Sequence, residues 1–322
     1  MSSQGAIAGS DERKSRLTVL KSLRSIFSFE NDGGLKDRLL TAFIVLAVAV
    51  GLTILAVELP LGGLVSVTFT AAIAVLSCYE VARLFARDPD TLAYRPVYGV
   101  LLFLVLSLPT FLAVLSGVSY VVTGVANAEG IMLATQGSAV TLIVMQVFSG
   151  RARIERASSF GERIIPAFLL VGVCAPQLVH LSSRSMGIHY VWWLAAVVAL
   201  NDAGAYFAGR SLGRHKIAPA LSPNKTIEGS VAGLIIGATA AALFGRWILG
   251  GCLDVGTLVA LGLVVTIAAQ AGDLSKSYLK RLRGVKDTGS FFPGHGGILD
   301  RFDGMIAGAP IMVIALRLCG VL

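Results

Sequence analysis

The chain has 322 residues, of which 55% are hydrophobic and only 14% are charged, and its mean hydropathy is +0.77. Soluble domains carry about 25% charged residues, so this composition excludes a soluble globular protein and predicts a polytopic membrane protein. The formal net charge of +8 could indicate nucleic-acid binding. The basic residues are scattered through short loops, however, which fits membrane topology and phosphate binding better than a nucleic-acid partner.

The predicted elements begin with a polar, basic tail at residues 1–38, which we expect to be partly disordered. A bilayer core of about 30 Å needs roughly 20 apolar residues per helix. The segments that approach this length are 39–58, 62–82, 96–117, 130–148, 164–182, 189–208, 229–249, 254–271 and 304–321. The sequence therefore predicts an all-α fold with about nine transmembrane helices.

The distribution of basic residues predicts the orientation of these helices. If the N-terminus lies inside, every Lys and Arg except Arg184, Arg246 and Arg317 falls in an inner segment. This asymmetry is what the positive-inside rule requires. We therefore expect a multi-pass protein of the inner (cytoplasmic) membrane, with a cytoplasmic N-terminus. An N-terminal transmembrane region at 39–190 would precede a C-terminal catalytic region at 191–322, whose cytoplasmic loops are 209–228 and 272–303.

The segment from 273 to 303 concentrates charge between two long apolar runs. Ionisable groups at a membrane boundary are costly unless they are paired or bind a metal, so this cluster indicates a functional site. Asp273, Ser277 and Lys280 share one helical face at i, i+4 and i+7. Asp300 and Asp303 share another at i and i+3. Two such faces can hold a hydrated Mg²⁺ beside bases that hold phosphates, which predicts phosphoryl-group chemistry on a lipid.

These residues also have structural interpretations. The acids could simply pair with Lys276, Lys280 and Arg301. The glycines around His295 would let the backbone approach a ligand, but His295 could equally be an ordinary loop histidine. The basic run from Lys280 to Arg283 could anchor the chain to anionic head groups.

A second polar segment covers residues 201–229. Asp202 lies inside an apolar span, where a carboxylate marks a functional site or bonds a neighbouring helix. Ser222-Pro223, with Lys225 and Thr226 close behind, resembles a helix start whose N–H groups, hydroxyl and ammonium could bind an anion. The same pattern is also common at ordinary helix starts.

Together these motifs resemble a known family. The pattern Ser277-x-Leu279-Lys280-Arg281, then Lys286-Asp287-x-Gly289, then Pro293-x-His295-Gly296-Gly297-x-x-Asp300-Arg301-x-Asp303 is similar to the signature of phosphatidate cytidylyltransferases, the CDP-diacylglycerol synthases. The upstream Asp202-x-x-Ala205-Tyr206 and Ser222-Pro223-x-Lys225-Thr226-x-Glu228-Gly229 also resemble that family. The continuation Ser230-Val231-Ala232-Gly233 is less glycine-rich than expected. The likeness covers about 200–304, and earlier residues match only in hydropathy.

The resemblance implies transfer of a cytidylyl group from CTP to phosphatidate, giving CDP-diacylglycerol and diphosphate for phospholipid synthesis. It implies Mg²⁺ bound by Asp273 and Asp300, a second, monovalent cation such as K⁺, and a homodimer. The implied catalytic residues are Asp273, Asp300, Asp303, Lys280 and Arg281. The implied substrate-binding residues are Ser222, Lys225, Thr226, Glu228, Lys286, His295, Arg301 and Asp202.

Three other functions stay open at this point. A CDP-archaeol synthase would use an ether-linked substrate, and a CTP-dependent lipid kinase would phosphorylate the lipid instead of cytidylylating it. An ion-coupled transporter would use carboxylates along a membrane pathway. Because the acids of the two polar segments are confined to one membrane face, and only Asp202 and Asp273 among them lie near a span, the sequence argues against the transporter.

Overall fold

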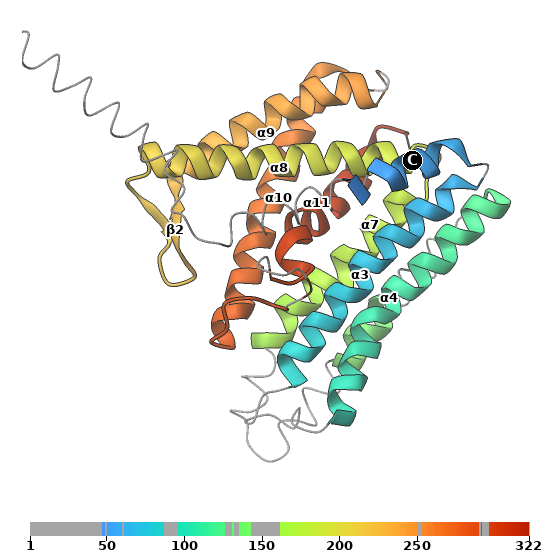
Figure 1. Cartoon of the computed structure of the whole chain (residues 1–322), viewed down its shortest axis with the longest axis horizontal. Helices are drawn as coiled ribbons and strands as arrows, with labels where there is room; N and C mark the ends of the chain where they lie inside the picture. The colour runs from blue at the N-terminus through green and yellow to red at the C-terminus, as the bar shows by residue number, and fades with distance from the viewer. Residues whose placement is uncertain are drawn as a thin grey trace, which may run out of the picture.

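The computed structural model describes residues 47–48, 50–59, 61–86, 96–125, 131, 135–142, 162–249, 251, 253–289, 291 and 296–321. These residues are mostly helical (Figure 1). The elements in chain order are α3 (Gly62–Ala86), α4 (Pro96–Thr123), η2 (Phe168–Cys174), α7 (Ala175–Ser182), α8 (Gly187–Leu212), β1 (Lys216–Ala218), β2 (Ser222–Thr226), α9 (Ile227–Ile248), α10 (Val255–Leu282) and α11 (Leu299–Leu318). The predicted all-α membrane protein is confirmed in outline.

Within the described ranges, six helices are long and apolar enough to cross a bilayer. They are Gly62–Ala86, Gly99–Thr123, Glu162–Ser182, Gly187–Leu212, Ile227–Ile248 and Val255–Leu282. The predicted spans 39–58 and 130–148 lie partly outside the described residues, and the predicted span 304–321 falls on α11, which is not among the six. The structure therefore supports a multi-pass helical protein without supporting the count of about nine.

The outer surface of α4 shows why these helices need a bilayer. Leu104, Phe111 and Leu115 are 54%, 58% and 50% exposed, and they follow one another along a single helical stripe. A continuous apolar stripe of this kind would be a liability in water, whereas hydrocarbon chains solvate it well. This stripe of α4 therefore suits contact with lipid chains.

The helices form two groups joined by α11. In Figure 1, α3, α4 and α7 run alongside one another, while α8 and α9 run together and are crossed by α10. Helix α11 contacts α10 and α8 on one side and α7, η2 and α3 on the other. Its buried side chains include Ile306 and Met312, both fully enclosed. Because α11 begins with two aspartates of the charged segment, this packing places them between the two groups.

Close packing of α9 against α8 and α10 depends on glycine. A Cβ at Gly233 would lie 2.8 Å from Asn201 Oδ1 and 2.9 Å from the Asn201 carbonyl oxygen of α8, and a side chain at Gly237 would collide with Thr266 of α10. Small residues at successive turns let membrane helices approach closely and gain dispersion contacts. The approach of these backbones brings Asp202 on α8 beside the carboxyl-terminal half of α10.

A short antiparallel hairpin, β1–β2, connects α8 to α9, with Lys216 opposite Thr226 and Ala218 opposite Ser222. The predicted helix start at Ser222 is therefore wrong. Pro223 keeps the preceding residue extended and lacks an N–H, so it is tolerated in an edge strand. The helix begins at Ile227 instead, where the Thr226 side chain accepts a hydrogen bond from Gly229 N at 3.2 Å.

Candidate functional site

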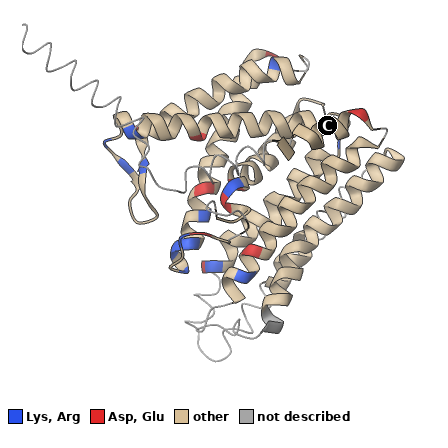
Figure 2. Ribbon diagram, in the orientation of Figure 1, with Lys and Arg blue, Asp and Glu red and all other residues tan. Residues whose placement is uncertain are grey.

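The charged residues from separate elements meet at one cavity of about 750 Å³. Its wall comes from the end of α8, the β1–β2 hairpin, the start of α9, the carboxyl-terminal half of α10 and the start of α11. Figure 2 shows Lys and Arg gathered around the ends of α8 and α10 and on the hairpin, beside the acids of the same region. The predicted site residues that line the cavity are Asp202, Lys225, Thr226, Asp273, Asp300, Arg301 and Asp303.

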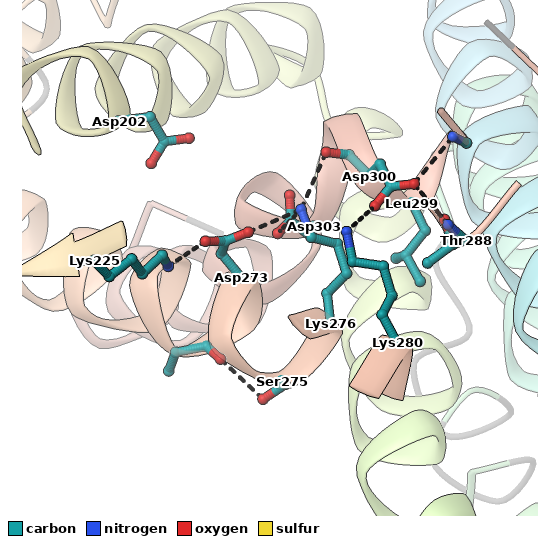
Figure 3. A network of polar contacts seen from close by, with 12 residues as sticks. Asp202, Lys225, Asp273, Ser275, Lys276, Lys280, Thr288, Leu299, Asp300 and Asp303 are labelled. Atoms are coloured by element: carbon teal, nitrogen blue, oxygen red, sulfur yellow. Dashed lines mark hydrogen bonds and ion pairs between the residues drawn. The ribbon is translucent and has the colours of Figure 1, made fainter. Parts of the chain in front are cut away.

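Asp273 on α10 is paired with two lysines from different elements (Figure 3). Its Oδ2 contacts Lys225 Nζ of the hairpin, and its Oδ1 lies 2.8 Å from Lys276 Nζ one turn further along α10. The side chains of Asp273 and Lys225 are 32% and 28% exposed, so both remain accessible from the cavity. Each of these two residues can therefore exchange the other for a ligand that enters the cavity.

Lys276 is the centre of the cluster, and the sequence had suggested only a neutralising role for it. Its side chain is 8% exposed, and Nζ lies 2.8 Å from Asp273 and 2.9 Å from Asp303 Oδ2. The same ammonium donates to the backbone carbonyl of Asp300 at 3.2 Å. Among the described residues, no donor meets Asp303 Oδ2 with hydrogen-bonding geometry, so this buried oxygen is held by charge alone.

Asp300, in the first turn of α11, has a different environment. Its Oδ1 pairs with Lys280 Nζ at 2.9 Å. Its Oδ2 accepts hydrogen bonds from Thr288 N at 2.8 Å, Thr288 Oγ1 at 2.9 Å and Gly297 N at 3.1 Å. Burial raises the pKa of Asp300, but the bonds from Lys280 and from these backbone groups outweigh it and hold the pKa below its ordinary value. Asp300 is therefore an anion locked in place.

Asp202 approaches the cluster from α8. Its Oδ1 accepts a bond from Asn201 Nδ2 at 2.9 Å, and Asn201 Oδ1 in turn accepts one from Gln270 Nε2 of α10 at 2.8 Å. In Figure 3 the carboxylate of Asp202 points toward the pair formed by Lys225 and Asp273. The chain of amides orients Asp202 and connects α8 with α10.

Some predicted site residues stabilise the hairpin in this structure. Glu228 accepts bonds from the backbone N–H groups of Arg214 and His215 at 3.0 and 3.2 Å. Thr226 caps α9, and Arg281 Nε donates to the Leu221 carbonyl at 3.2 Å. These contacts hold the hairpin against α9 and α10, so they position Lys225 at the cavity.

The remaining predicted residues do not meet at the cavity wall. Among residues that the structure describes, Ser222, Glu228, Lys280, Arg281 and Lys286 are outside its lining, although Lys280 reaches it through Asp300. His295 lies outside the described residues. Ser277, predicted to share the face of Asp273, is also absent from the lining. Their assignment to substrates stays a prediction.

The pairing of the acids with Lys276 and Lys280, which the sequence offered as their structural interpretation, is present in the structure. Sequence reasoning missed two other participants, Glu80 and Thr288. Glu80, a lone carboxylate inside the predicted span 62–82, carried the signal that marks an intramembrane functional residue. Thr288 carried no signal, because its value lies only in a hydrogen bond to Asp300 that the fold creates.

No group of three or more His, Cys, Asp and Glu side chains within the described segments is arranged to hold a metal by itself. Mg²⁺ does not need such a group, since it is usually held by one or two carboxylates, water and substrate phosphates. The cavity offers hard oxygen donors on Asp273, Asp300 and Asp303, of which the buried Asp303 Oδ2 lacks a hydrogen-bond donor. This donor set fits a divalent cation that is completed by phosphate oxygens.

Comparison with known proteins indicates the same family as the sequence motifs. The model of the cytidylyltransferase family matches residues 36–319. The phosphatidate cytidylyltransferase of Staphylococcus haemolyticus is 43% identical over 135 residues, covering 42% of this chain and 52% of that protein. The protein of the same name from Bacillus subtilis is 37% identical over 153 residues, covering 47% of this chain and 56% of the relative.

The chain thus spans about half the length of the curated relatives it matches. The family match is far longer than these pairwise matches, because it extends from before the first predicted span to just past the end of α11. It also covers every residue of the cavity described above. On this evidence the chain belongs to the cytidylyltransferase family.

Proposed function

We propose that this protein transfers a cytidylyl group from CTP to phosphatidate, with CDP-diacylglycerol and diphosphate as products. The observation that carries the proposal is the meeting of Lys225, Asp273, Lys276 and Asp303 on one cavity at the ends of membrane helices. The names of the curated relatives support the choice of substrates. A cavity of about 750 Å³ is large enough for a nucleotide with a lipid phosphate beside it.

The reaction needs positioning more than it needs a base. An oxygen of the lipid phosphate attacks the α-phosphorus of CTP, and the bond from that phosphorus to the β-phosphate bridge oxygen breaks. The attacking phosphate is already ionised at neutral pH, so no proton has to be removed. The main barriers are repulsion between two anions and charge that develops on the departing diphosphate.

Lysines in the cavity address both barriers. Lys225 is positioned by the hairpin and neutralised by Asp273, so an entering phosphate can replace that carboxylate as its partner. Lys276 is buried and is held by both Asp273 and Asp303, which fixes a positive charge at the base of the cavity. Arg210, Lys216 and Arg301 add further positive charge along the wall. Fixed cations of this kind stabilise charge in the transition state without reorganisation.

We also propose that Asp273 and Asp300 hold Mg²⁺, with Asp303 close by and with room for a second, monovalent cation. Their oxygens face the cavity and are now neutralised by lysines, as expected for acids that can exchange a lysine for a metal. When bound, Mg²⁺ would supply positive charge against the phosphates of CTP and the leaving diphosphate.

The orientation follows from the same proposal. CTP is a cytoplasmic solute, so the ends of α3, α8 and α10 that carry Arg83, Arg210 and Lys280 in their last turns would face the cytoplasm. That arrangement agrees with the positive-inside rule. We retain about nine membrane helices, a cytoplasmic N-terminus and a homodimer as parts of the proposal.

The decisive experiment uses purified protein in detergent micelles with phosphatidate, Mg²⁺ and CTP labelled at either the α- or the γ-phosphate. Cytidylyl transfer places the α-label in the lipid and the γ-label in diphosphate. A lipid kinase would place the γ-label in the lipid, and a transporter would label no lipid at all. Either of the last two results would overturn the proposal.

Two comparisons complete this experiment. Replacing phosphatidate with an ether-linked analogue separates a CDP-diacylglycerol synthase from a CDP-archaeol synthase. The variant Asp300→Asn should lose lipid labelling, because Asp300 lies on the wall of the cavity. Glu58→Gln is the matched control, since Glu58 is an exposed carboxylate that does not line the cavity.

A further inference from the structure

Glu80 is a carboxylate near the carboxyl-terminal end of the membrane helix α3, and it is 6% exposed. A buried charge in a membrane helix is costly unless hydrogen bonds satisfy it. Three donors satisfy Glu80, and all belong to the charged segment more than 200 residues later in the chain. They are Ile298 N at 2.8 Å, Leu299 N at 3.0 Å and Thr288 Oγ1 at 3.2 Å.

Two of these donors are the first N–H groups of α11. The helix starts at Leu299, and its own N-cap residue, Ile298, supplies no side-chain hydrogen bond. The carboxylate of Glu80, which belongs to α3, accepts these N–H groups in place of an N-cap side chain. Its negative charge also interacts favourably with the positive end of the α11 dipole. The position of the first turn of α11, which carries Asp300, is therefore set by Glu80.

The third donor connects Glu80 directly to Asp300. Thr288 Oγ1 lies 3.2 Å from Glu80 Oε2 and 2.9 Å from Asp300 Oδ2, so one hydroxyl lies between two carboxylates. Because a hydroxyl has one proton, it can donate to only one of them at a time. Thr288 N holds Asp300 Oδ2 at 2.8 Å whichever carboxylate receives that proton.

Two glycines of the charged segment are explained by the same contact. A Cβ at Gly289 or at Gly297 would overlap the carboxylate of Glu80. At Gly289 the nearest atoms are all from the Glu80 side chain. The backbone of the segment thus wraps around this carboxylate, which leaves room only for glycine at the two points of closest approach.

We infer that Glu80 is a positioning residue for the reaction. It lies on α3, in the group formed by α3, α4 and α7, and it sets the position of Asp300 through the start of α11 and through Thr288. This inference rests on the proposed cytidylyl transfer. It assigns a role in catalysis to α3, a helix that contributes no side chain to the wall of the catalytic cavity.

The test compares steady-state kinetics of Glu80→Gln with those of the wild type. Loss of the charged cap should let Asp300 shift, and a displacement of about 1 Å at a reacting centre costs on the order of 100-fold in rate. We expect kcat to fall 10- to 100-fold with KM for CTP changed less than about threefold, because the phosphate-binding lysines stay in place. Ser77→Ala is the matched control. Ser77 is buried one turn earlier on α3, and within the described part of the chain its side chain bonds only Ile73 O of its own helix.

Gly289→Ala tests the same contact without removing the carboxylate. Its added methyl group should push Glu80 aside and lower kcat as Glu80→Gln does. In the double variant Glu80→Ala with Gly289→Ala the methyl group enters vacated space, so kcat should be no lower than in Glu80→Ala alone. If Glu80→Gln does not fold, this pair of glycine variants decides the question in its place.

The outcomes separate the inference from the function on which it rests. An inactive wild-type protein would remove the proposed function. An active wild type with a folded Glu80→Gln variant whose kcat stays within twofold would overturn the inference alone. The double variant gives a second way to overturn it. If its loss of kcat equals the product of the losses in Glu80→Ala and Gly289→Ala, the two positions act independently.

Discussion

Asp273 and Asp303 both contact Lys276. Asp300, whose Oδ1 also pairs with Lys280, and Glu80 accept hydrogen bonds from backbone N–H groups of the same segment. We call the first two the lysine-paired acids and the second two the backbone-held acids. Side-chain partners can rotate toward an entering ligand, but backbone partners cannot. One charge cluster in this membrane protein thus combines lysine-paired acids, which can exchange their partners, with backbone-held acids, whose position is fixed.

The largest expected effect belongs to a lysine-paired acid that lines the cavity. Asp273→Asn should lower kcat for cytidylyl transfer by 100- to 1,000-fold, as expected when one preorganised charge is removed from a site. The apparent Tm should change little, because Lys276 keeps Asp303 as its partner. Initial rates with α-labelled CTP and a thermal melt in detergent measure both. A variant with near wild-type rate would remove Asp273 from the mechanism.

The second effect concerns the base of the cluster. Lys276→Met should destabilise the protein by about 3–5 kcal/mol, since it leaves the buried carboxylate of Asp303 without its cation, whereas Asp273 keeps Lys225. The added substitution Asp303→Asn should recover part of that loss. Chemical denaturation of the single and double variants gives the coupling. Equal stability of the two variants would show that Asp303 does not depend on Lys276.

A smaller effect is expected at Lys225, whose side chain is 28% exposed. Lys225→Gln should raise KM for CTP or for phosphatidate about tenfold, and it should cost less than about 1 kcal/mol of stability, as surface ion pairs do. Lys225→Arg keeps the charge and serves as the control. Separate titrations of the two substrates show which phosphate Lys225 binds, and unchanged KM values for both would argue against either contact.

The smallest effect concerns Asp300, one of the backbone-held acids, and appears in the pH dependence of stability. The pKa of Asp300 is held below its ordinary value of about 4 by Lys280 and by two backbone N–H groups, so its ionised form stabilises the fold. This contribution is complete above about pH 5 and is lost as the pH falls through the lowered pKa. The Tm difference between wild type and Asp300→Asn should therefore shrink in acid. A difference that stays constant from pH 6 to pH 3 would contradict the assignment.

Composition and local spacing were sufficient for much of this protein. Apolar segments of bilayer length identified a multi-pass helical membrane protein, because hydrocarbon thickness sets the length of a span directly. The two charged segments were also recognised in advance, since acids, bases and glycines are rare in such a chain. The order of their motifs was enough to indicate the family that the longer match then showed.

Only the tertiary structure decided which partner each charge has. The i+3 spacing could pair Lys276 with Asp273, but nothing in the local pattern placed Asp303 on its other side, and nothing joined Glu80 to a helix that starts 219 residues later. The helix expected at Ser222 was wrong for the same reason, because pairing with β1 across the hairpin outweighs the local preference. Helical spacing limits contacts within one element, but contacts between elements depend on how whole helices pack, and that information is spread over the entire chain.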